Sequence, residues 1–155
     1  MLDGEKTVFW VKPDLEKEHT VVRRVAKEFR IAQRHILDSL QTAELRKLDS
    51  DTWRRLRNTD SKRVRPGHVS DVKQILSDTS KNWERVKEAY EEGGTLPSAI
   101  ILLLSDGTPY LLAGNVRLMM AKAMRDTPKV LIGQLPKNLG ITWKTLVEIE
   151  TTKRK

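Results

Sequence analysis

The chain has 155 residues, which is the size of one domain and leaves little room for two. It contains no cysteine, which excludes disulfide bonds, thiolate metal sites and cysteine nucleophiles, and its longest apolar run, Ala99 to Leu104, is too short to cross a membrane. With 29 Lys and Arg against 21 Asp and Glu the formal net charge is +8, so we expect a polyanionic partner such as nucleic acid, no membrane partner and a cytoplasmic location.

Residues 1–95 are predicted to be mainly helical. From residue 22 to residue 40 apolar side chains recur at spacings of three and four, which predicts one long helix that starts after Pro13. The apolar residues 8–11 are expected to add an extra strand to a sheet formed farther along the chain. Three further helices are expected to begin at Ser50, Ser70 and Ser80.

The pattern changes after residue 95, where short apolar runs alternate with turns. The run Ala99–Leu104 predicts a buried strand, because it is too short for a stable helix and too apolar for an exposed strand. Asp106-Gly107 predicts a hairpin turn, and Tyr110–Ala113 the returning strand.

The last third of the chain predicts a helix and at least one more strand. Gly114 ends the preceding strand, residues 116–124 are expected to form a helix, and residues 130–132 a third strand. Residues 141–149 fit either a helix capped by Thr142 or a β-branched strand.

These elements predict an α/β (α+β) fold with a small mixed sheet and packed helices. We expect residues 96–150 to form a phosphate-binding core and residues 1–95 to pack on it as a helical segment, giving one compact domain. The oligomeric state is left open.

The most informative motif is the junction between a strand and a helix at Ala113-Gly-Asn-Val-Arg-Leu118. The first backbone N–H groups of a helix are unpaired and carry the positive end of its dipole, so such a junction can bind an anion. Gly114 lets a phosphate approach the backbone, Asn115 can cap the helix or donate a hydrogen bond, and Arg117 offers a fork of donors. The alternative is an ordinary turn followed by a surface charge.

The residues around this junction resemble the ParB/sulfiredoxin superfamily. The resemblance runs from Leu96-Pro97 through Asp106-Gly107 and Gly114–Leu118 to Pro128–Ile132, and it is closest to the small stand-alone ParB-like proteins of bacterial viruses. Upstream, Trp53 and the loop Asn58-Thr-Asp-Ser61 also resemble that subgroup.

This resemblance implies that Gly114, Asn115 and Arg117 contact the phosphates of a nucleoside triphosphate, ATP or CTP. The matching turn holds a cytidine nucleotide in partition proteins and ATP in sulfiredoxin, and it serves phosphoryl transfer in a free-serine kinase. Asn115 stands where sulfiredoxin has its cysteine, so that reductase chemistry is excluded. Val116 replaces a second basic residue of partition proteins, and the 38 residues after Arg117 are too few for their helix-turn-helix.

Phosphoryl transfer also needs charge neutralisation, usually by Mg²⁺, and a carboxylate that acts as a base or positions the nucleophile. The candidates are Asp60, whose loop belongs to the resemblance, and Glu28. Asp60 fits equally well as a turn or N-cap residue. The three histidines lack the spacing of metal ligands, so no zinc site is expected.

Basic side chains gather between residues 51 and 66. Closely spaced arginines at a helix end suit the phosphate backbone of nucleic acid, although a solvated basic face is an equal alternative. The expected nucleic-acid contacts are Arg54, Arg55, Arg57, Arg63 and Arg65.

Three functions follow as alternatives. The first is an NTPase or a kinase that uses the nucleotide for phosphoryl transfer to a nucleic-acid or small hydroxyl substrate. The second is a nuclease, because members of this superfamily have been credited with phosphodiester cleavage, and the third is a non-catalytic module that binds DNA or nucleotide. Residues 96–135 contain only two carboxylates, Asp106 and Asp126, which weighs against a metal-dependent nuclease.

Overall fold

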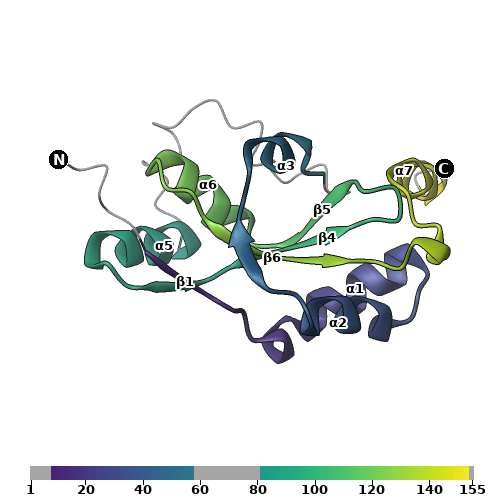
Figure 1. Cartoon of the computed structure of the whole chain (residues 1–155), viewed down its shortest axis with the longest axis horizontal. Helices are drawn as coiled ribbons and strands as arrows, with labels where there is room; N and C mark the ends of the chain where they lie inside the picture. The colour runs from purple at the N-terminus through teal and green to yellow at the C-terminus, as the bar shows by residue number, and fades with distance from the viewer. Residues whose placement is uncertain (1–7, 58–80, 154–155) are drawn as a thin grey trace.

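The computed structural model describes residues 8–57 and 81–153, with the backbone alone at 81–83 and 149–153. Its centre is a mixed sheet with the strand order β2-β6-β4-β5 (Figure 1). Strand β4 pairs antiparallel with β5 and parallel with β6, while β2 runs antiparallel to β6. The four strands are β2 (Leu45–Lys47), β4 (Ala99–Leu103), β5 (Pro109–Ala113) and β6 (Lys129–Gln134).

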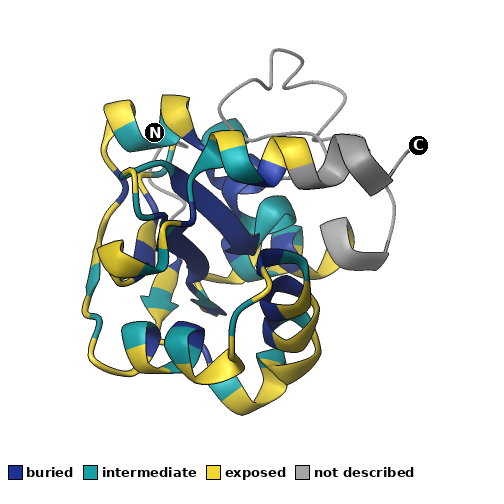
Figure 2. Ribbon diagram, turned by 90° about the vertical axis from the view of Figure 1, so that its right-hand side faces the viewer, coloured by how far each residue is buried: buried dark blue, intermediate teal, exposed yellow. Residues whose placement is uncertain are grey.

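Helices cover both faces of this sheet, which explains why β4 and β5 are almost continuously apolar. Ile100 and Leu102 pack on one side, and their neighbour Ile101 packs on the other. Figure 1 shows α1 and α2 below the sheet and α3 and α6 above it, and Figure 2 shows the buried strands between helices with exposed outer faces. The helices are α1 (His19–Phe29), α2 (Gln33–Gln41), α3 (Ser50–Arg55) and α6 (Asn115–Ala123).

The predicted long helix over residues 22–40 is wrong, because α1 ends at Phe29. Arg30 adopts a left-handed conformation with φ 59°, and the N–H groups of Arg30 and Ile31 bond to the Ala26 carbonyl. This is a helix-terminating geometry that usually employs glycine. The break allows the apolar faces of both α1 and α2 to pack on the same side of the sheet, in one core cluster.

Two strands come from residues 1–95, which were expected to be mainly helical with one strand at residues 8–11. β2 was not expected, and it joins the main sheet beside β6. Residues 8–11 do contain a strand, β1 (Phe9–Val11), but it pairs with β3 (Thr95–Pro97) in a separate two-stranded parallel sheet.

The hairpin, α6 and β6 are confirmed near the positions that the sequence predicts. Of residues 141–149, those from Trp143 onward form a helix, α7 (Trp143–Lys153), and the Thr142 hydroxyl accepts the N–H of Thr145 at 3.1 Å as its cap. Helix α5 (Lys81–Glu92) packs against α6 and ends at Gly93, where φ is 68°. The expected helix start at Ser70 lies outside the described residues.

Two short 3₁₀ helices complete the described elements. They are η2 (Leu15–Glu18), which leads into α1, and η4 (Lys137–Leu139), which precedes α7. Within the described residues no helix has both the length and the apolar content that crossing a bilayer requires.

Candidate functional site

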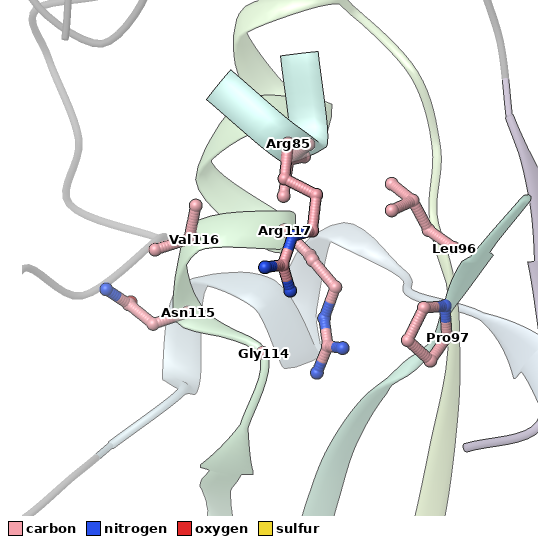
Figure 3. Close-up of a pocket in the computed structure, with 8 residues that line it drawn as sticks. Arg85, Leu96, Pro97, Gly114, Asn115, Val116 and Arg117 are labelled. Atoms are coloured by element: carbon pink, nitrogen blue, oxygen red, sulfur yellow. The ribbon is translucent and has the colours of Figure 1, made fainter. Parts of the chain in front are cut away.

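A cavity of about 380 Å³ lies where α6 begins, between this helix, α5 and strand β3. Its volume is in the range of small-ligand pockets. Figure 3 shows the guanidinium groups of Arg85 and Arg117 converging beside Gly114. The cavity therefore brings together the three residues that the sequence motif singles out, Gly114, Asn115 and Arg117.

Gly114 adopts φ 102° immediately before α6, and no side chain of the described residues caps the helix there. A Cβ at this position would lie 2.5 Å from the Cβ of Ala99 and 3.0 Å from Nη2 of Arg117. The glycine is therefore required by packing of the turn on β4, and the Arg117 side chain lies directly against it. The uncapped first turn leaves the positive end of the α6 dipole at the cavity.

Arg117 is mostly buried, and its Nε has no hydrogen-bond partner among the described residues. Burial lowers the pKa of the Arg117 guanidinium, and the negative charge of Glu18 offsets part of this shift. Among the described residues no carboxylate forms an ion pair with Arg117. A buried guanidinium without a counter-ion is unfavourable, so an anionic ligand would satisfy it.

The second arginine of the cavity, Arg85, was missed by the sequence reasoning. It lies on α5 next to the buried Val86, and its side chain points toward Arg117 (Figure 3). Periodicity marks Val86 and Tyr90 as the core face of α5, which leaves Arg85 on a neighbouring face. No sequence signal indicates that α5 lies beside α6, and so the pairing of the two arginines is a tertiary feature.

Asn115 plays a smaller part in the observed geometry. Its Nδ2 donates a hydrogen bond to Sδ of Met119 at 3.5 Å, while its Oδ1 is buried and finds no partner in the described part of the chain. The side chain points away from the two guanidinium groups (Figure 3). Contacts to an anion at this turn would therefore come from the backbone N–H groups and the arginines.

Of the two candidate carboxylates only Glu28 is among the described residues, and it does not line the cavity. Glu28 lies on α1, and its carboxylate is 4.0 Å from the guanidinium of Arg24. Asp60 lies outside the described residues. The carboxylate that acts on Arg117 is instead Glu18, at the end of η2.

The arginines of the basic segment lie elsewhere. Arg54 and Arg55 both bond to Asp51, at 2.9 and 3.5 Å, and Arg57 donates to main-chain carbonyls of its own segment. Arg55 also reaches the carbonyl of Gly107, in the turn that precedes β5, whereas Gly114 follows β5. The contact of Arg55 with Gly107 and the turn at Gly114 are therefore roughly 20 Å apart along β5. The expected contacts Arg63 and Arg65 lie outside the described residues.

No group of three or more His, Asp or Glu side chains in the described residues could hold a metal ion. Comparisons with known proteins find no matching family model, no matching curated protein and no matching solved structure.

Proposed function

We propose that the protein binds a nucleoside triphosphate, ATP or CTP, with its phosphates in the cavity at the start of α6. One observation carries this proposal: two guanidinium groups without a described carboxylate partner converge on an uncapped helix N-terminus. Two cations that point into one cavity repel each other, and a phosphate group between them turns this repulsion into attraction. The ParB/sulfiredoxin resemblance, which assigns phosphate contacts to the same turn, supports the proposal.

We further propose that the bound nucleotide serves phosphoryl transfer, as in an NTPase or in a kinase acting on a nucleic-acid or small hydroxyl substrate. Arg85 and Arg117 would neutralise the charge of the phosphoryl group that is transferred. Asp60 is proposed as the base. Mg²⁺ normally accompanies such chemistry, but the described residues offer it no cluster of ligands, so no catalytic step is assigned to it.

A non-catalytic nucleotide-binding module is the second candidate. It is favoured by the lining of the cavity, in which the described residues include no carboxylate and no histidine. The same lining argues against a nuclease, since cleavage of a phosphodiester requires an acid–base group or a metal site beside the phosphate.

Calorimetry with a panel of nucleoside triphosphates tests the phosphate contacts. Arg117→Ala and Arg85→Ala are each expected to weaken binding about 10- to 100-fold, because each loses charge-assisted hydrogen bonds. Arg117→Ala should unfold at a urea concentration close to that of the wild type, since Nε has no described hydrogen-bond partner to lose. Arg34→Ala, which removes an exposed arginine from α2, is the matched control and should bind normally.

Equal affinities in the wild type and both pocket variants would refute the phosphate site. Release of labelled phosphate from the γ-position, or its transfer to an acceptor, distinguishes the enzyme from the binding module. An Asp60→Asn variant that turns over at the wild-type rate would remove Asp60 as the base.

A further inference from the structure

A second cavity, of about 350 Å³, lies at the opposite end of α6, and residues of α3 and of this helix end line it. Figure 1 shows both helices above the main sheet. None of the residues that line this cavity belongs to the proposed phosphate site. The lining combines an aromatic ring, two cations and several small polar groups: Leu48, Ser50, Trp53, Lys122, Arg125, Asp126, Thr127 and Pro128.

Trp53 forms the aromatic wall of this cavity. Its indole is half-buried and packs against the core cluster that contains Leu56 and Leu118. Among the described residues, the indole N–H donates no hydrogen bond and no cation stacks on the ring. The exposed part of the ring is therefore available to a planar ligand.

Lys122 and Arg125 supply the positive charge. Neither forms an ion pair with a described carboxylate. Asp126 also lines the cavity, but its Oδ2 already accepts hydrogen bonds from Tyr90 at 2.8 Å and from Trp10 at 3.2 Å. Interaction with the negative end of the α6 dipole accounts for cations at this place, although it does not account for an indole beside them.

We propose that this cavity binds a nucleotide unit of a single-stranded nucleic acid, with the base against Trp53 and the neighbouring phosphates on Lys122 and Arg125. A stacking ring next to unpaired cations is the combination by which proteins bind single strands. In a duplex each base is stacked between its neighbours and cannot reach a ring in the wall of a cavity.

The inference rests on the proposed function in one respect, because it names nucleic acid as the substrate class. Its physical basis is separate, since the two cavities lie at opposite ends of α6, about 13 Å apart along the helix axis. The two proposals can therefore fail independently.

Fluorescence anisotropy of a labelled ten-residue oligothymidylate, without nucleotide, tests the inference. Trp53→Leu is expected to weaken binding at least about fivefold, and Trp53→Phe, which keeps an aromatic ring, should retain most of the affinity. Lys122→Gln combined with Arg125→Asn should weaken binding and flatten its salt dependence. Asparagine suits the left-handed conformation of Arg125, whose φ is 56°.

Lys137→Gln combined with Lys144→Gln is the charge-matched control, because both lysines are exposed and neither lines the cavity. This control should change the affinity less than twofold, and Arg117→Ala should bind the oligonucleotide like the wild type. If Arg117→Ala loses nucleotide binding but the cavity variants bind the oligonucleotide normally, the inference fails and the proposed function stands. If the wild type and the Arg117→Ala variant bind nucleotide equally but the cavity variants lose the oligonucleotide, the proposed function fails and the inference stands. Absence of wild-type binding, or equal affinity for a duplex of the same length, would also overturn the inference.

Discussion

Two features of the structure require a glycine at position 114. Its backbone has φ 102°, which side-chain-bearing residues rarely adopt, and its missing Cβ would stand 2.5 Å from the Cβ of Ala99. The sequence reasoning explained this glycine by the approach of a phosphate, whereas packing of the turn on β4 already requires it. The residues that distinguish a phosphate site from an ordinary tight turn are therefore Arg117 and Arg85.

Gly114→Ala is expected to lower the free energy of unfolding by about 2–3 kcal/mol, because backbone strain and overlap with Ala99 add together. Gly107→Ala is the matched control. Gly107 has φ 86° with no atom within 4 Å of an added Cβ, so it should lose only about 1 kcal/mol through the backbone. Urea denaturation measures both changes, and equal losses would show that the contact with Ala99 is not the cause.

At the scale of secondary structure, the sequence predicted the elements whose patterns are long or bounded by strong turn signals. The hairpin around Asp106-Gly107 and the helix after Gly114 are of this kind. The break at Arg30 could not be predicted, because an arginine in a left-handed conformation leaves no sequence signal. β2 was missed for another reason: three residues, two of them charged, show no periodicity, and pairing with β6 alone makes them a strand.

The docking of α7 on the hairpin turn depends on Asp106. Its Oδ1 accepts the N–H of Thr108 at 3.0 Å, and its Oδ2 accepts the N–H of Trp143, the first residue of α7, at 3.2 Å. Burial raises the pKa of Asp106, but these hydrogen bonds outweigh burial and the pKa lies below its ordinary value of 3.8. A lowered folded-state pKa means that the carboxylate stabilises the fold at neutral pH and that this stabilisation is lost as the pH falls through the folded-state pKa.

Asp106→Asn is therefore expected to lower the free energy of unfolding by about 1 kcal/mol at pH 7, and by less as the pH approaches 3. Urea denaturation across this pH range measures the difference between variant and wild type. Asp38→Asn, an exposed position on α2, serves as the control and should give a small difference. If the difference in free energy of unfolding between Asp106→Asn and the wild type stays constant with pH, the charge of Asp106 is not its cause.

Across the whole molecule, Asp126 joins the two-stranded sheet and α5 to the main body. It follows α6, and its Oδ2 accepts hydrogen bonds from Tyr90 on α5 and from Trp10 on β1. The rings of Trp10 and Tyr90 also contact each other edge to face, with their centroids 6.4 Å apart. Burial, followed by the hydrogen bond to Asp126 and its charge, raises the pKa of Tyr90. Because α5 also carries Arg85, this link determines where the second guanidinium stands relative to Arg117.

Removing the link should therefore affect stability and nucleotide affinity together. Asp126→Ala leaves the buried Tyr90 hydroxyl without its partner and is expected to lower the free energy of unfolding by about 1–3 kcal/mol. In that background Tyr90→Phe should be nearly neutral, whereas in the wild type it should cost about 1 kcal/mol, and urea denaturation of all four proteins measures this coupling. Additive effects would show that the hydrogen bond between Asp126 and Tyr90 does not join α5 to the main body.

The same link is tested by nucleotide binding. If Asp126→Ala weakens nucleotide binding only when Arg85 is present, the link acts by positioning the Arg85 guanidinium. An equal loss of affinity in the Arg85→Ala background would show that Asp126 affects nucleotide binding by another route.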